Sequence, residues 1–143
     1  RIATCLNSLP LNDPEVAIHV VVNGSTDATA SIAADIASTA SNVRVHVFKE
    51  GGKARSWNRF LFDQLTAFHA THVFVDGDAE IVPGSIAALE ATLKAQPGAN
   101  AAAGLPMNGR KMAYYQQAMR AEQAGDAALA QRLRRRMDLV SGR

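Results

Sequence analysis

The sequence predicts an α/β fold in which a parallel sheet is flanked by helices. Three short runs rich in β-branched and aromatic residues, at residues 16–22, 43–48 and 72–75, are expected to be strands. The segments between them repeat their apolar residues at helical spacing. Because strand and helix alternate, the strands are expected to run parallel and to be joined by right-handed crossovers.

The bulk composition is that of a globular domain. The chain has 143 residues, of which 48% are hydrophobic and 20% charged, and this length suffices for one core. No apolar run approaches the ~20 residues needed to span a bilayer. Cys5 is the single cysteine, so no internal disulfide can form. We expect Cys5 to be a small core residue and the protein to be cytoplasmic, since a chain without disulfides suits a reducing compartment.

Helices are expected between and around the strands in the first half of the chain. Residues 1–9 have helical spacing and are stopped by Pro10, and a second helical pattern follows the first strand and continues to Ala40. A third helix is expected over residues 54–70. Its apolar residues would form one buried face: Trp57, Phe60, Leu61, Leu65 and Phe68.

The second half of the chain reads as mostly helical. Residues 83–95 predict a helix with proline in its first turn, whose inward face would carry Ile86, Leu89 and Leu93. Residues 99–105 are a candidate fourth strand, although their alanine and glycine content is unfavourable. Residues 111–137 predict a helical segment that is interrupted near Gly125.

Charge divides the chain at about residue 106. Residues 1–106 carry a net charge of −3 and residues 107–143 carry +5. No aromatic residues are interleaved with the basic ones, which disfavours nucleic acid as a partner. The basic segment suits a solvated helix face or a frayed end; the alternative is peripheral contact with an anionic membrane at its inner face. Its excess charge comes mostly from Arg132, Arg134, Arg135 and Arg136.

The three strong strands all end in polar loops that contain glycine, at residues 23–25, 49–53 and 76–78. Parallel strands place such loops at one edge of the sheet, where open α/β folds bind ligands. Asp76 and Asp78 repel each other unless a cation lies beside them, and a divalent metal that carries phosphate would meet that need. The alternative is a turn with two solvated carboxylates. Together the loops suit a nucleoside diphosphate with a divalent ion.

Four motifs in this order resemble segments of the family 2 glycosyltransferases. Residues 20–29 (VVVNGSTDAT) resemble the family's "V-V-D-D-G-S-T-D-x-T", and residues 52–58 (GKARSWN) resemble "G-K-A-x-A-L-N". Residues 75–83 resemble the metal-binding "D-x-D" with its continuation, and residues 1–9 resemble the family's first helix. The match covers roughly residues 1–105.

The resemblance implies a GT-A fold, with a Rossmann-like nucleotide-binding sheet, and transfer of a sugar from a nucleotide-diphosphate sugar to an acceptor, usually with inversion and with Mn²⁺ or Mg²⁺. Residues 1–106 would be the donor-binding part and residues 107–143 the start of the acceptor side. Carried over by motif, Asp78 would bind the metal, and Asp76 would contact the ribose or share the metal. The other implied donor-binding residues are Asn23, Ser25, Gly52, Lys53 and Asn58.

The chain departs from the family pattern in three ways. Val22 and Asn23 stand where two acidic residues are usual, which leaves the nucleotide preference open. No equivalent of the family's first strand is present, and much of the acceptor half is missing. We expect residues before Arg1 to supply that strand; the alternatives are that the two flanking strands pair directly or that a second chain fills the gap. No catalytic base can be assigned, since each candidate is better explained as a helix-surface charge: Glu122, Asp126 and Asp138.

Other functions fit less well. A dinucleotide fold would need G-x-G-x-x-G after a strand, and a P-loop would need Ser or Thr after Lys53, where the chain has Ala54. A sugar-phosphate nucleotidyltransferase would need a glycine-rich, arginine-bearing loop near its first strand, and none is visible. The remaining alternative is a nucleotide-binding module, or an incomplete fragment, that lacks transferase activity.

Overall fold

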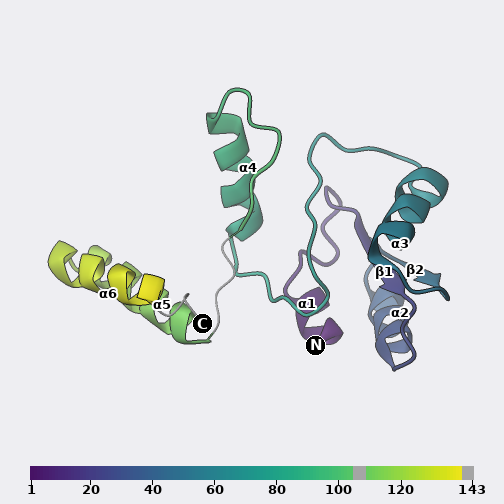
Figure 1. Ribbon diagram of the computed structural model, residues 1–143, viewed down its shortest axis with the longest axis horizontal. Coiled ribbons are helices and arrows are strands. Elements are labelled where there is room, and N and C mark those ends of the chain that lie inside the picture. The colour runs from purple at the N-terminus through teal and green to yellow at the C-terminus, as the bar shows by residue number, and fades with distance from the viewer. Residues whose placement is uncertain (105–108, 140–143) are drawn as a thin grey trace. The chain divides into compact units, whose positions relative to one another are not determined.

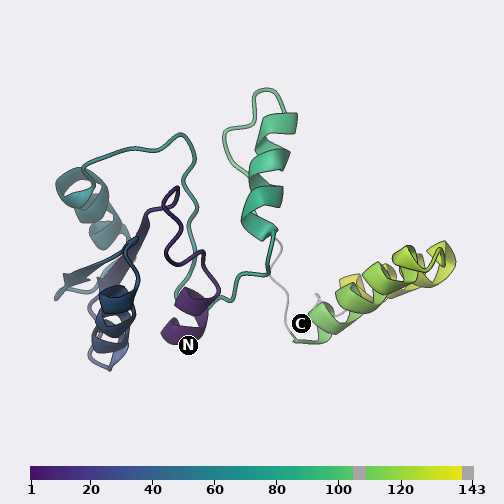
Figure 2. The same cartoon turned by 180° about the vertical axis from the view of Figure 1, so that it is seen from behind.

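The computed structural model describes residues 1–104 and 109–139, except for the side chain of residue 138. Their contacts divide the chain into two compact units, Arg1–Ala102 and Ala103–Arg143. Each unit can be followed in Figures 1 and 2. The boundary expected after residue 106 lies outside the described residues.

The first unit is built on a two-stranded parallel sheet. Strand β1 is Ile18–Asn23 and strand β2 is Val43–Phe48, paired from Ile18 opposite Val43 to Asn23 opposite Phe48. Helix α2, Thr29–Thr39, connects them. The first two expected strands and the helix between them are therefore confirmed, and the chain is a mixed α/β protein.

One face of this sheet carries the hydrophobic core. Helix α1, Ile2–Asn7, and helix α2 contribute Leu6 and Ala33, both buried, to this face. Ala33 is fully buried because its small side chain lets α2 approach the strands closely. Cys5 is also buried, at 3% exposure, as its helical spacing predicts. The remaining core residues are Ile18, Val20, Val22, Ala40 and Val43.

The other face is covered by α3, Lys53–Arg59, and by the turn of π-helix that continues it, Phe60–Gln64. The ring of Phe60 packs against the rings of His19 and His46, with centroids 5.1 and 5.0 Å away. The helix expected over residues 54–70 is thus wrong beyond Gln64. Phe68, which the helical pattern predicted to be buried, is 72% exposed.

The expected third strand at residues 72–75 is wrong. These residues form no strand, and Val73 and Phe74 are exposed. A strand is stabilised by the ladder it forms with a neighbour. Within the described ranges β1 pairs with β2 alone, so residues 72–75 have no ladder to join. Phe74 instead packs against Trp57, with ring centroids 4.3 Å apart.

Helix α4, Ser85–Ala95, forms close to where it was expected but buries none of its residues. Ile86, Leu89 and Leu93 are only half-buried, so the expectation that they face a core is wrong. The candidate fourth strand is also wrong for residues 99–104, which form no strand, and Leu105 lies outside the described residues.

The second unit is a pair of packed helices, α5, Gly109–Gln123, and α6, Ala127–Leu139. The expected interruption near Gly125 is confirmed, since Gly125 has φ +78° between the helices. Small side chains let the helices approach, and the buried apolar residues are Ala118, Ala121, Ala130 and Leu133. Among the helices described in both units, none is long and apolar enough to cross a membrane.

Candidate functional site

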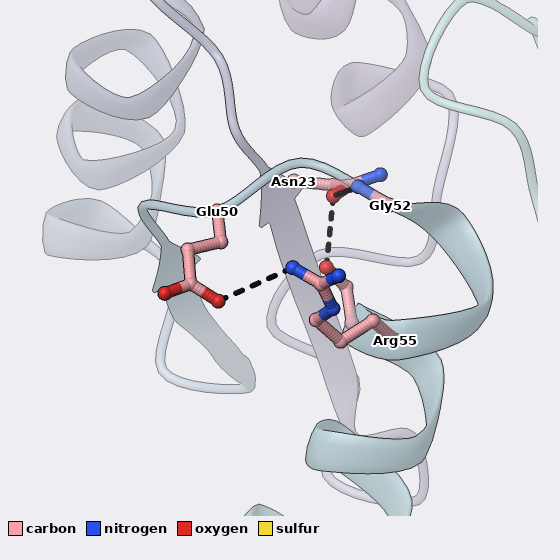
Figure 3. Close-up of polar contacts among 5 residues, drawn as sticks. Asn23, Glu50, Gly52 and Arg55 are labelled. Carbon is pink, nitrogen blue, oxygen red and sulfur yellow. Dashed lines mark hydrogen bonds and ion pairs between the residues drawn. The ribbon is translucent and has the colours of Figure 1, made fainter.

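Asn23, the last residue of β1, joins the ends of both strands. Its carbonyl oxygen Oδ1 accepts a hydrogen bond from the backbone N–H of Gly52, at 2.8 Å, and a second from the hydroxyl of Ser56, also at 2.8 Å. Figure 3 shows the Asn23 side chain reaching the loop at Gly52. Ser56 is only 2% exposed, so Asn23 satisfies a polar group that water does not reach. The loop after β2 is therefore fixed to the end of β1.

Glycine at position 24 makes this close approach possible. Gly24 has φ +60°, and a Cβ atom added there would lie 2.6 Å from both Cα and N of Gly51. No real side chain tolerates that distance to backbone atoms. Within the second loop, Arg55 and Glu50 form an ion pair at 3.3 Å across the glycines, as Figure 3 shows. The two loops are thus in backbone contact.

The loop at residues 76–78 also lies beside the loop that follows β2, although no strand precedes it. The ammonium of Lys53 lies 2.7 Å from Oδ1 of Asp76, and this contact raises the pKa of Lys53 above its ordinary value. The thiol of Cys5 donates to the backbone oxygen of Asp76 at 3.7 Å, and Ile81 N–H donates to the hydroxyl of Ser8 at 2.9 Å. Contacts to α1 and α3 therefore hold this loop.

An open cavity of about 360 Å³ lies between the first and third loops. Its size falls within the ~300–1,000 Å³ typical of small-molecule sites. The guanidinium of Arg1 lies 3.9 Å from Asp78 at its rim, where both side chains are well exposed. The polar lining includes Asn23, Ser25, Asp27 and Asp78.

Asp27 is a fixed negative charge in this cavity. Hydrogen bonds from Ser25 and from the backbone N–H of Thr29 lower its pKa to about 2. A carboxylate that accepts several hydrogen bonds is stabilised in its ionised form. Asp27 is therefore ionised at neutral pH, and the hydroxyl hydrogen of Ser25 is committed to it.

The structure brings together most of the donor-binding residues expected from sequence. Asn23 and Gly52 are hydrogen-bonded, and Lys53 and Asp76 are ion-paired. Ser25 and Asp78 line the same cavity as Asn23. Asn58 is different, because it lies exposed on α3 and no hydrogen bond connects its side chain to the residues gathered here. Their binding roles stay predictions.

Sequence reasoning missed Ser56, Asp27 and Arg1. Ser56 could have been found, since the chain has serine where the segment it resembles has alanine, next to the departure at Asn23. Asp27 belongs to the quoted motif, and its position two residues after Ser25 permits the observed hydrogen bond. Nothing in the pattern pointed to Arg1.

The carboxylates of Asp76 and Asp78 suit a hard divalent cation, because Mg²⁺ and Mn²⁺ prefer oxygen ligands. Both are exposed, and each has a cationic side chain nearby, Lys53 beside Asp76 and Arg1 beside Asp78. Among residues 1–104 and 109–139, no three His, Cys, Asp or Glu side chains cluster closely enough to hold a metal alone. The residues fit a metal whose remaining ligands are phosphate oxygens and water.

Two of the candidate bases are occupied by helix-surface contacts. Glu122 forms an ion pair with Arg134 at 2.7 Å, between α5 and α6. Asp126 accepts a hydrogen bond from Leu129 N–H at 2.9 Å and so caps the start of α6. The side chain of Asp138 lies outside the described residues.

Comparisons with known proteins support one family. No curated protein and no solved structure gives a significant match to the chain. A sequence model described as glycosyl transferase family 2 matches residues 1–140, nearly the whole length. The motifs at residues 20–29, 52–58 and 75–83 fall within this match. The chain therefore belongs to glycosyl transferase family 2.

Proposed function

We propose that the chain binds a nucleotide-diphosphate sugar and transfers its sugar to an acceptor hydroxyl, with Mn²⁺ or Mg²⁺ and with inversion, on a GT-A scaffold. Residues 1–106 would bind the donor and residues 107–143 would begin the acceptor side. The observation that carries the proposal is the meeting of three loops, joined by the Asn23–Gly52 hydrogen bond and the Lys53–Asp76 ion pair.

Each group in this arrangement has a role suited to its charge. Asp78 and Asp76 would hold the metal, and Lys53, which is exposed beside them, would contact the diphosphate. Asn23 and Ser25, across the cavity from Asp78, would lie against the nucleoside. The metal, when bound, would offset the negative charge that builds on the leaving diphosphate.

The transfer itself forms one bond and breaks one. The acceptor oxygen attacks the anomeric carbon from the side opposite the diphosphate, and the bond from that carbon to the diphosphate oxygen breaks. The acceptor's proton passes to a base. Glu122 and Asp126 are engaged in helix contacts, and no residue is assigned here as that base.

Calorimetric titration with UDP-, GDP- and dTDP-sugars, with and without Mn²⁺, tests the proposal. Binding is expected with at least one donor, only with metal, and Asp78→Ala should weaken it roughly tenfold or more, since a charge-assisted contact contributes about 1.5–3 kcal/mol. Asp35→Ala, an exposed carboxylate on α2, is the matched control and should bind as the wild type does. Unaltered binding in Asp78→Ala would overturn the metal role.

The alternative is a nucleotide-binding module that lacks transferase activity. It predicts the same metal-dependent binding but no release of nucleotide diphosphate when sugar acceptors are added. A coupled assay for released nucleotide diphosphate therefore separates the two. Release that exceeds slow donor hydrolysis, and that depends on Asp78, supports the transferase.

Helix α6 adds a candidate membrane contact. Arg132, Arg135 and Arg136 are exposed, and their spacing places them on one face of the helix. We propose that this face contacts anionic lipid, which would place the protein at the inner face of a membrane. At low salt the wild type should sediment with phosphatidylserine vesicles. A variant with these three arginines changed to glutamine should stay in the supernatant.

A further inference from the structure

Two histidines face each other across the paired strands, away from the loops of the candidate site. His46 of β2 lies opposite Val21 of β1, so His19, two residues earlier, is its diagonal neighbour on the same face of the sheet. Nδ1 of His19 lies 3.0 Å from Nε2 of His46, and the two rings are stacked at 26°. His19 lies about 13 Å along β1 from Asn23, since a strand rises ~3.3 Å per residue. The pair is therefore separate from the three loops.

The spacing of these two nitrogens is close to that of two ligands on one metal ion. Nitrogens that each lie ~2.0–2.1 Å from a tetrahedral Zn²⁺ are about 3.3 Å apart. His19 and His46 reach that separation if their nitrogens move apart by about 0.3 Å and each ring tilts toward the ion. The proton of their hydrogen bond then moves to the outer nitrogen of the same ring. Both facing nitrogens offer lone pairs, and the neutral pair releases no net proton.

The surroundings keep the pair in the form that binds metal. Burial lowers the pKa of both rings, so both are neutral at neutral pH, as a metal-ligating imidazole must be. Phe60 packs against both rings and supplies an apolar cover on one side. A hydrogen bond between Gln64 and His46 opposes the effect of burial on His46. Metal-ligating histidines commonly donate their other ring N–H to such a side-chain oxygen.

We propose that His19 and His46 form a binding site for a borderline divalent transition metal such as Zn²⁺. Among residues 1–104 and 109–139 no third His, Cys, Asp or Glu joins them, so water fills the remaining positions. Imidazole favours Zn²⁺ over Mg²⁺ and Mn²⁺, which prefer the oxygen ligands of Asp76 and Asp78. The bound ion links β1 to β2. This site does not depend on the proposed function, because it requires no nucleotide.

Calorimetric titration of the full chain with ZnCl₂ at neutral pH tests the proposal. One Zn²⁺ should bind per chain, and excess Mg²⁺ should not displace it. His19→Gln and His46→Gln should each weaken binding by roughly tenfold or more, since losing a ligand costs at least as much as losing one of its outer partners. The matched control is His72→Gln, which changes an exposed histidine that stacks on Phe74. It should bind Zn²⁺ as the wild type does, and so should Asp78→Ala.

Imidazole ¹⁵N resonances of the wild type locate the ion without any substitution. Zn²⁺ should shift Nδ1 of His19 and Nε2 of His46 together and leave the rings of His69 and His72 unchanged. Binding that is equally tight in His19→Gln and His46→Gln, ring shifts confined to His69 or His72, or no binding of Zn²⁺ would overturn the inference. Donor binding with Mn²⁺ should be unaltered in His46→Gln. The zinc site and the proposed function can therefore fail separately.

Discussion

Replacing Gly24 by alanine tests whether contact between the first two loops holds the site together. The new Cβ would lie 2.6 Å from the Cα and N atoms of Gly51, so the backbone of one of the two loops must move. Alanine also costs about 1–2 kcal/mol where glycine has φ +60°. Separating the loops breaks the Asn23–Gly52 hydrogen bond, which adds about 0.5–1.5 kcal/mol. The expected loss of unfolding free energy is therefore about 1.5–3.5 kcal/mol.

Gly84→Ala is the matched control. Gly84 also has a positive φ, +83°, but a Cβ there would meet no atom within 4 Å. Its cost is the conformational strain alone, about 1–2 kcal/mol. The excess loss in Gly24→Ala over Gly84→Ala thus isolates the contact with Gly51.

Urea unfolding followed by circular dichroism measures both losses, and amide hydrogen exchange at Gly52 reports the loop directly. Exchange at Gly52 should accelerate in Gly24→Ala and not in Gly84→Ala. Donor binding should weaken in the first variant only. If the two variants lose equal stability and Gly52 stays protected in both, the loops do not depend on this contact and the reasoning is refuted.

Three further predictions follow from other contacts. Burial lowers the pKa of both His19 and His46, whose ring nitrogens lie 3.0 Å apart. The charge of His46 lowers the pKa of His19 further. Because the unfolded chain then binds more protons, the free energy of unfolding should fall as pH drops below about 6.5, and His46→Gln should flatten that slope in urea titrations. Burial also raises the pKa of the Cys5 thiol, so a disulfide reagent at pH 8 should modify it more slowly in the folded protein than in urea; equal rates would contradict its buried position. Ser56→Ala should cost about 0.5–1.5 kcal/mol in thermal unfolding, since one of the two hydrogen bonds to Asn23 is lost, and no change would show that this bond contributes nothing.

Sequence pattern predicted the part of the fold that local signals determine. The apolar runs that became β1 and β2, the helix between them and the break at Gly125 are all visible in residue spacing and turn chemistry. Residues 72–75 have the same local signal as the confirmed strands. A strand also requires a partner, however, and no count of β-branched residues shows whether one is present.

The sequence predicted which residues belong to the candidate site but not the contacts between them. Motifs pointed to Asn23, Lys53 and Asp76, and the structure joins them through Gly52 and Ser56. The loop at residues 76–78 meets the others through α1 and α3, which lie far from it in sequence. Such long-range contacts depend on packing that residue patterns do not encode. Asn58, which matches its motif, lies exposed on α3 without a hydrogen bond to these residues, and its role stays a prediction.

Paramagnetic broadening by Mn²⁺ tests the central claim most directly, namely that the three loops form one metal-dependent donor site. The experiment uses the full ¹⁵N-labelled chain with a nucleotide diphosphate, and Mg²⁺ as the diamagnetic reference. The account predicts strong broadening at the amides of Ser25, Gly52 and Gly77, and loss of the effect in Asp78→Ala. Broadening centred elsewhere, or the same broadening in Asp78→Ala, would contradict it.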